Sequence, residues 1–261
     1  MTSQPIPIFT TIVCGVDATP AGLDAVRQAS RLVDPGGSVH LVTAASIAKA
    51  AQAGMAAVHA AQLMQDEAQA ALTEAEAIAP EASSKLVGGN PAAALLREAE
   101  TQHATLLAVG SHDRRRTPAL LLGTVAASML RDAPCSVLIA RAPRDPDAWP
   151  ESIVAGIDGS AESAAAAMVA RELAERFGGS ARVVASTSDQ LDAEAARVIA
   201  PDLEELPDRA VDLLATASES ADLIVIGSRG LHGMKALGSV SERVAHRASC
   251  SVLVVRTAAA G

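Results

Sequence analysis

The sequence contains almost no aromatic residues: two phenylalanines, one tryptophan and no tyrosine among 261 residues. Modules that grip single-stranded nucleic acid stack bases on aromatic rings, so this composition argues against that class of protein. Lysine is also scarce, with only Lys49, Lys85 and Lys235, and the formal net charge is −9. A broad nucleic-acid surface needs clustered lysine and arginine to neutralise phosphates, so we expect no nucleic-acid partner.

Cysteine and long hydrophobic runs are scarce as well. Three cysteines, an odd and small number, do not indicate a disulfide framework. Residues 1–9 lack the basic start and the apolar stretch of a signal peptide. Charged residues interrupt the alanine-rich region 44–79, so no membrane-spanning helix is expected. We therefore expect a cytoplasmic protein without a membrane partner.

An internal repeat organises the chain. The run Ile-Val-Cys-Gly-Val-Asp at 12–17 recurs as Ile-Val-Ala-Gly-Ile-Asp at 153–158, which is 141 residues later. Three further blocks recur in the same order: 37–38 as 179–180, 106–111 as 223–228, and 135–141 as 250–256. The separation falls from 142 to 117 residues between the second and third blocks, so the second copy lacks about 25 residues in its middle. We predict two domains, 1–141 and 153–261, joined by a proline-containing linker at 142–152.

Each copy alternates short apolar runs, typical of strands buried on both faces of a parallel sheet, with helix-forming segments. In the first copy the pattern predicts strands at 11–16, 38–44, 83–88, 105–110 and 136–141, and helices at 21–33, 50–78, 91–102 and 123–132. The predicted fold class is therefore α/β, with two tandem doubly wound domains of five parallel strands each.

The second copy departs from this plan in its middle. The sequence predicts a helix from Ser160 to about Phe177, stopped by Gly178 and Gly179, and then a strand at 182–187. Only about 20 residues remain before Pro207, whereas a parallel crossover needs a dozen or more. The long helix of the first copy is therefore absent or shorter here, and the third strand is short, paired differently or absent.

In an open parallel sheet, ligands bind outside the carboxyl ends of the strands. Asp17 and Asp158 follow the first strands, and glycine-containing loops follow the fourth strands. Glycine allows close approach of a phosphate, serine donates hydrogen bonds, and a following helix directs its amides at the anion, while a strand-end carboxylate can bind a ribose hydroxyl. The expected nucleotide-binding residues are Asp17, Gly110, His112, Arg114, Gly123, Thr124 and Val125 in the first copy, and Asp158, Ile226, Gly227, Arg229, Gly230, Gly238, Ser239, Val240 and Ser241 in the second.

These motifs make the chain similar to tandem universal stress proteins over nearly its whole length. The resemblance rests on Asp17 and Asp158, on the Val-Gly-Ser and Ile-Gly-Ser-Arg-Gly turns after strand four, and on Leu-Gly-Ser-Val-Ser-Glu-Arg-Val at 237–244. It implies a Rossmann-like, adenine-nucleotide alpha-hydrolase-like fold. It also implies a stress-response protein that binds ATP or a related adenine nucleotide, with Mg²⁺ accompanying the phosphates.

Neither copy has the full ATP-binding pattern of that family, which is Gly, two residues, Gly, nine residues, Gly and then Ser or Thr. The first copy keeps the spacing from Gly110 to Gly123 but carries Asp113 at the second glycine, where its carboxylate would repel phosphates. The neighbouring arginines 114–116 either offset this charge or form a solvated face of the loop. The second copy keeps its three glycines, but its last spacing is seven residues rather than nine.

Three functions stay open on these residues: a nucleotide-responsive stress protein, a nucleotide-free interaction scaffold with an unknown protein partner, and a slow ATPase. The sequence has no Walker A motif, dinucleotide fingerprint or nucleophile elbow, so we expect no enzyme beyond incidental ATP hydrolysis. Asp17 and Asp158 have an alternative role as helix or turn caps. His112 and His232 lack partners at ligand spacing, so no metal site is expected, and the three cysteines are interpreted as small buried residues.

Each copy ends in an apolar strand, at 136–141 and 251–256, which is expected at the edge of its sheet. An apolar edge favours pairing with another strand, and in the resembling family such edges pair between domains. We therefore expect an internal pseudo-dimer, and a further homodimer of the whole chain stays open.

Overall fold

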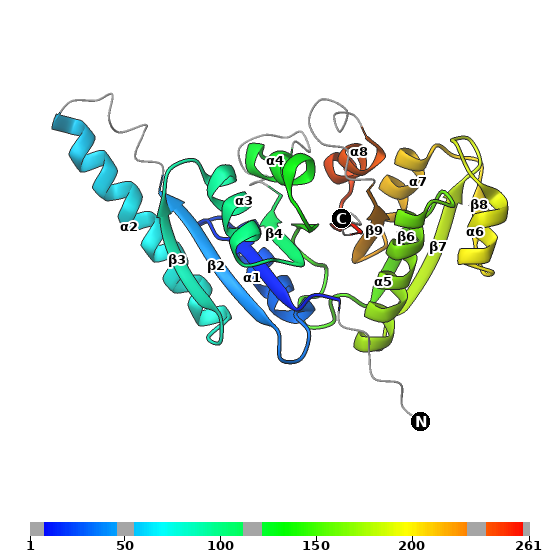
Figure 1. The fold of residues 1–261 in the computed structure, drawn as a ribbon, viewed down its shortest axis with the longest axis horizontal. Helices are drawn as coiled ribbons and strands as arrows, with labels where there is room; N and C mark the ends of the chain where they lie inside the picture. The colour runs from blue at the N-terminus through cyan, green and yellow to red at the C-terminus, as the bar shows by residue number, and fades with distance from the viewer. Residues whose placement is uncertain (1–7, 46–54, 112–121, 229–238, 258–261) are drawn as a thin grey trace.

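The computed structural model describes residues 8–45, 55–111, 122–228 and 239–257. Within these ranges, strands and helices alternate along the chain, and the strands form one continuous sheet. The two halves of the chain lie side by side along this sheet (Figure 1). The predicted α/β class is confirmed.

The first domain contributes five parallel strands to the sheet. They are β1 (Thr11–Gly15), β2 (Ser38–Ala45), β3 (Ser83–Gly88), β4 (Leu106–Gly110) and β5 (Ser136–Ala140), in the spatial order β3-β2-β1-β4-β5. Its described helices are α1 (Pro20–Leu32), α2 (Met55–Ile78), α3 (Pro91–Thr101) and α4 (Thr124–Asp132). Local sequence explains where α1 and α3 begin. The Thr19 and Asn90 side chains accept hydrogen bonds from amides of the first turn, and a proline follows each cap.

The second domain repeats this arrangement. Its strands are β6 (Ser152–Gly156), β7 (Ser180–Ser186), β8 (Glu204–Leu206), β9 (Leu223–Gly227) and β10 (Ser251–Val255), in the order β10-β9-β6-β7-β8. Its described helices are α5 (Ala161–Phe177), α6 (Ala193–Ile199), α7 (Ala210–Ala217) and α8 (Val240–Arg247). Helix α5 ends at Gly178, which has the left-handed conformation (φ 67°) that glycine adopts without a steric penalty, as predicted.

The shortened middle of the second domain has a definite topology. Helix α6 has seven residues where α2 has 24. The following strand, β8, has three residues and still pairs in parallel with β7. Of the three predicted outcomes for the third strand, the short one is therefore correct, because the remaining chain is long enough for a crossover but not for a long helix.

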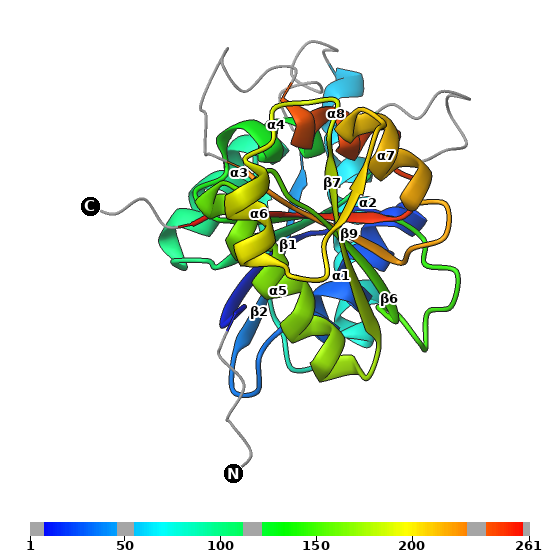
Figure 2. The same ribbon diagram turned by 90° about the vertical axis from the view of Figure 1, so that its right-hand side faces the viewer.

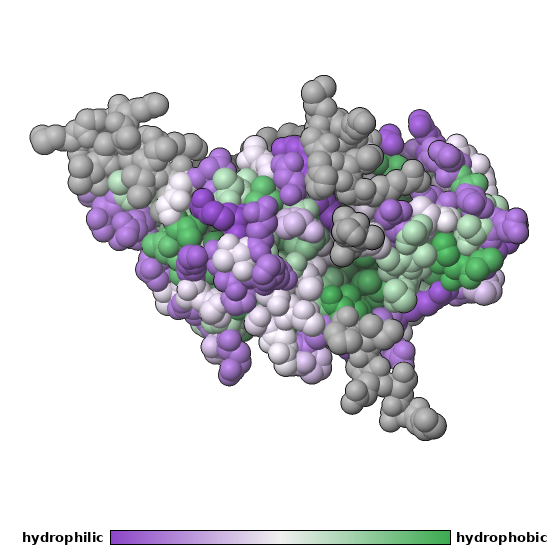
Figure 3. Space-filling model, viewed as in Figure 1, coloured by the Kyte–Doolittle hydropathy of each residue, from purple (hydrophilic) through white to green (hydrophobic). Residues whose placement is uncertain are grey.

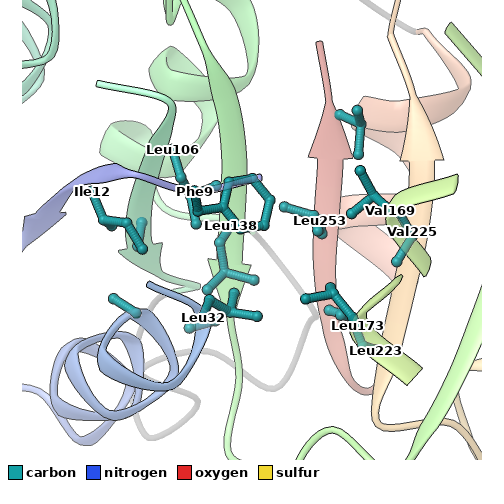
Figure 4. Close-up of a cluster of buried hydrophobic side chains, with 14 of the residues drawn as sticks. Phe9, Ile12, Leu32, Leu106, Leu138, Val169, Leu173, Leu223, Val225 and Leu253 are labelled. Atoms are coloured by element: carbon teal, nitrogen blue, oxygen red, sulfur yellow. The ribbon is translucent and has the colours of Figure 1, made fainter. Parts of the chain in front are cut away.

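The two domains join through their last strands. Strand β10 pairs antiparallel with β5, with Leu253 opposite Leu138, so the sheet runs unbroken from one domain into the other. Figure 4 shows the side chains of Leu138 and Leu253 close together on these neighbouring strands. Two arginines, Arg141 after β5 and Arg256 after β10, each donate hydrogen bonds to two backbone carbonyls of the other domain, one in its last helix and one between that helix and its last strand. The predicted pairing of the two edge strands is thus observed within the chain.

The hydrophobic core lies on both faces of the sheet. Helices α1, α2, α5 and α6 pack on one face, and α3, α4, α7 and α8 pack on the other, as the view in Figure 2 illustrates for several of them. Because both faces are covered, the central strands β5 and β10 are buried along their whole length, and each consists of apolar residues after an initial serine. Among the described residues, no helix combines the length and hydropathy needed to cross a membrane.

Candidate functional site

Each domain has a pocket where its parallel strands end at their carboxyl termini, as expected for this topology. The pocket of the second domain has a volume of about 410 Å³, and that of the first domain about 290 Å³. In each pocket the wall includes the ends of the first, second and fourth strands of that domain and the start of the helix that follows the fourth strand.

The strand-end aspartates line these pockets and also organise the next helix. In the first domain, Asp17 Oδ1 accepts hydrogen bonds from the amide (3.1 Å) and hydroxyl (2.6 Å) of Thr19, the cap of α1. In the second, Asp158 Oδ1 accepts from the amide (3.0 Å) and hydroxyl (2.5 Å) of Ser160, the cap of α5. The helix-start role that we considered for both aspartates is therefore present, and it fixes each carboxylate on the wall of its pocket.

The glycines that end the fourth strands have a packing role. A Cβ atom on Gly110 would lie 2.6 Å from the carbonyl oxygen of Ala21, and one on Gly227 would lie 2.4 Å from that of Glu162. The first turn of α1 or α5 thus crosses directly over the strand end. Both glycines also line their pockets, but close backbone packing alone accounts for them.

Helix α8 presents its amino-terminal end to the pocket of the second domain. Ser239, the cap of this helix, accepts a hydrogen bond from the Glu242 amide (3.2 Å), and its hydroxyl lies 3.1 Å from that of Ser241. Ser239, Val240 and Ser241 all line the pocket. A helix start with two adjacent hydroxyls favours an anion through its free amides and dipole.

The loop after β7 adds residues to the second pocket that the sequence did not single out. Asp189 accepts a hydrogen bond from the Ala210 amide (2.6 Å) at the start of α7, and its own amide donates to the Ser186 hydroxyl (3.1 Å). Asp189 and Ser186 line the pocket, as does Leu130 from α4 of the first domain. Asp189 could have been predicted to lie at the pocket, because it follows the end of a strand. Nothing in the sequence indicates that Leu130 of the other domain lies there.

In the first domain, Asp17, Gly110 and Val125 line the pocket, whereas Gly123 and Thr124 begin α4 without reaching its wall. Helix α2 contributes Met64 and Glu67 to this pocket. The second domain has no counterpart of this long helix at its pocket, because α6 is short and lies elsewhere. The two pockets therefore differ in the elements that form their walls.

Five predicted nucleotide-binding residues lie outside the described ranges: His112, Arg114, Arg229, Gly230 and Gly238. Asp113, Arg115, Arg116 and His232, which were also considered from the sequence, lie outside them as well. In the part of the chain that the structure describes, no cluster of histidine, cysteine, aspartate or glutamate is arranged to hold a metal ion.

The three cysteines are buried, as predicted. Removal from water disfavours the thiolate and raises the pKa of Cys14 and Cys250 to about 12 and that of Cys135 to about 11. All three thiols therefore stay protonated near neutral pH and are poor nucleophiles.

Two α/β domains in tandem, each with a pocket at the carboxyl ends of its strands, define the doubly wound class of protein. Within that class, a model of the universal stress protein family matches residues 9–141 and 184–256. The chain therefore belongs to the universal stress protein family, with its domain present in tandem.

Several individual proteins are similar to this chain. Universal stress protein Rv2005c of Mycobacterium tuberculosis is 32% identical over 186 residues, which cover 60% of this chain and 63% of that protein. A universal stress protein from Archaeoglobus fulgidus shares the fold, with a TM-score of 0.76 over 98% of both chains at 16% identity. A universal stress protein solved in complex with cAMP matches 51% of this chain and 98% of its own, at 26% identity and a TM-score of 0.41.

Proposed function

We propose that this chain is a nucleotide-responsive stress protein that binds ATP or a related adenine nucleotide in the pocket of its second domain. One observation carries the proposal: Asp158, Ser239 and Ser241, which are far apart in the sequence, line the same pocket. A carboxylate can accept hydrogen bonds from ribose hydroxyls, and serine hydroxyls and helix-start amides can donate to phosphate oxygens. The residues present therefore fit both halves of a nucleotide.

The second domain is a better candidate than the first for two reasons. Its pocket is larger, about 410 Å³ against about 290 Å³. It also keeps a hydroxyl that the first domain has lost, because Ser241 corresponds in the repeat to Ala126, which is 1% exposed. A phosphate at the start of α4 would thus have one hydrogen-bond donor fewer than a phosphate at the start of α8.

The charge of the pocket sets the conditions for binding. Asp158, Glu162 and Asp189 line it, so its described wall is acidic. Acidic groups suit the amino group of adenine and the ribose hydroxyls, but they repel phosphates. We propose that Mg²⁺ enters with the phosphates and offsets this repulsion.

The role that we propose is regulatory, in the cytoplasm, without catalytic turnover beyond incidental ATP hydrolysis. A nucleotide-free scaffold that binds a protein partner is the second candidate. It is favoured by the capping contacts of Asp158 and the close packing at Gly227, which explain both residues without a ligand.

A matched pair of substitutions tests the proposal by calorimetric titration of nucleotide-stripped protein with ATP and Mg²⁺. Ser239→Asp keeps a good helix cap, since aspartate caps as well as serine, but places a carboxylate on the pocket wall. The repulsion predicts at least about a tenfold loss of ATP affinity, equivalent to about 1.4 kcal/mol. Val125→Asp places a carboxylate on the wall of the first pocket, at the second residue of α4, and should leave the affinity unchanged.

The outcomes separate the candidates. Equal loss of affinity in both variants would place binding in both domains, and loss only in Val125→Asp would place it in the first. No binding heat by wild-type protein at millimolar ATP, and no nucleotide released on denaturation of the purified protein, would reject the proposal and leave the scaffold. The same titration with ADP, AMP and cAMP identifies the preferred nucleotide.

A further inference from the structure

Because the two domains are repeats, each residue of one domain at their junction has an equivalent residue in the other domain. Strands β5 and β10 occupy equivalent places in the repeat and pair antiparallel, so the two sides of the junction are related by an internal twofold axis. At the repeat separation of 141 residues, Ile8 corresponds to Trp149 and Gln28 corresponds to Val169. These equivalent residues differ in size and polarity, so the two sides of the junction are packed differently.

One side is filled by the only tryptophan of the chain. Trp149 is 1% exposed, and its indole Nε1 donates a hydrogen bond to the Asp222 carbonyl oxygen (3.1 Å). Beside it, the Gln28 side chain donates to the Arg141 carbonyl (2.7 Å) and accepts from the Ser251 hydroxyl (2.8 Å). An indole ring and an amide are thus both buried on this side.

The other side contains a cavity of about 360 Å³. Ile8 replaces the tryptophan and Val169 replaces the glutamine, so both the ring and the amide bridge are missing. The cavity is lined by Ile8, Phe9, Ala104, Thr105, Pro134, Cys135, Ser136, Met168, Val169, Glu172, Val255 and Arg256. The first-domain residues lie just before β1, β4 and β5 or at the first residue of β5, and the second-domain residues come from α5 and the carboxyl end of β10. The cavity shares no lining residue with either strand-end pocket.

The mouth of the cavity is apolar and open to solvent. Met168, on α5, is 60% exposed although it lines the cavity. Figure 3 shows apolar surface gathered at this junction beside α5. A large exposed thioether next to a concave apolar wall is typical of a surface that binds a flat apolar group.

Polar groups at the cavity wall can orient such a group. The Thr105 carbonyl is the repeat equivalent of the Asp222 carbonyl, which accepts the indole N–H on the filled side. Arg256 donates through its two terminal nitrogens to the Ala133 and Leu130 carbonyls, while its buried Nε has no hydrogen-bond partner. Burial lowers the pKa of this guanidinium, so one edge of the cavity carries a poorly hydrated cation.

We propose that this cavity is a binding site for a small planar aromatic heterocycle of about the size of indole. The ligand replaces, on the open side, the ring that Trp149 supplies on the filled side. Its ring packs between Phe9, Val169 and Met168, and a ring N–H donates to the Thr105 carbonyl. The site is separate from the proposed nucleotide pocket and does not depend on nucleotide binding.

Indole itself is the probe, and the full chain is titrated while its amide chemical shifts are followed by NMR. We expect saturable shifts of residues that line the cavity, with a dissociation constant below about 1 mM, the weak end of specific small-ligand binding. Ile8→Trp gives the open side the residue of the filled side. It should weaken indole binding at least tenfold and raise the unfolding temperature.

Two further variants keep the test informative if Ile8→Trp does not fold. Met168→Trp places a ring over the cavity from an exposed position and should also weaken binding at least tenfold. Leu63→Trp adds a ring at an exposed position on α2, far from the cavity, where Leu63 is 51% exposed. Indole binding should be unchanged in this control.

Three results would overturn the proposal. The first is wild-type protein that shows no saturable shift with indole. The second is binding that Met168→Trp and Ile8→Trp leave unaffected. The third is self-association in ultracentrifugation that Ile8→Trp abolishes while indole does not bind, because the occupant would then be a second copy of the chain.

Discussion

Replacement of Trp149 by alanine tests how the two domains are held together. The side chain comes from the segment that connects β5 to β6, yet it is 1% exposed and packs against residues of both domains. Its Nε1 also donates a hydrogen bond to the Asp222 carbonyl, immediately before β9. Loss of this ring would empty the filled side of the junction and leave the carbonyl without that donor.

The size of the effect follows from these two contributions. Truncation of a buried tryptophan to alanine destabilises a protein by about 3–5 kcal/mol, through lost transfer free energy and the cavity that remains. The lost hydrogen bond belongs to the same side chain, so we expect a total near 4 kcal/mol. For a chain of this size, that corresponds to a fall of roughly 8–16 °C in the unfolding temperature. Trp149→Phe keeps most of the ring and should cost only about 1–2 kcal/mol.

Circular dichroism at far-ultraviolet wavelengths is the appropriate assay, because Trp149 is the only tryptophan and fluorescence disappears with it. Wild-type protein, Trp149→Phe and Trp149→Ala are unfolded by heat and by urea under identical conditions. A loss below about 1 kcal/mol in Trp149→Ala would show that the ring contributes little. It would also remove the basis for comparing the filled and open sides of the junction.

Two further predictions concern stability. Burial raises the pKa of all three thiols in the folded state. As the pH rises above about 9, the thiols of the unfolded chain therefore lose their protons before those of the folded chain. Each thiol should lower the free energy of unfolding by about 1.4 kcal/mol per pH unit up to about pH 11. Urea unfolding at several pH values in this range measures how the free energy of unfolding changes with pH, and the chain has no tyrosine that would titrate there. Cys14→Ala should make this change smaller. An equal change in the wild-type protein and the variant would contradict the reasoning. Leu253→Pro removes a backbone donor from the strand that joins the domains, and small-angle scattering should detect an altered domain arrangement. Leu253→Ala, which keeps the donor, should preserve the arrangement at lower stability, and an unchanged scattering curve for Leu253→Pro would count against the pairing.

Much of the fold could be predicted because its signals are local. The apolar run at β1, the caps at Thr19 and Ser160 and the stop at Gly178 act within a few residues, and each predicted element was found within a few residues of its place. The duplication then supplied the order of the second domain. It also indicated where about 25 residues are missing, since insertions and deletions accumulate in crossovers rather than in the central strands.

The candidate site was predictable only in part. Strand-end aspartates and helix-start serines could be found in the sequence, because the carboxyl ends of parallel strands always meet at one edge of the sheet. Asp189 and Leu130 were missed, because their presence at the second pocket depends on how the β7 loop folds and on the approach of α4 from the other domain. The glycines were interpreted as phosphate contacts, whereas the structure also gives them a packing role against α1 and α5.

By itself, the sequence determined the α/β class, the tandem repeat and the strand ends where a ligand site would form, because periodicity, capping and duplication are properties of neighbouring or aligned residues. The tertiary structure was needed to show that the second pocket is the larger of the two, and that Trp149 is buried on one side of the junction while a cavity lies beside Val169 on the other. Cavities arise from side chains that meet across distant segments, and their volumes depend on packing that no local pattern specifies.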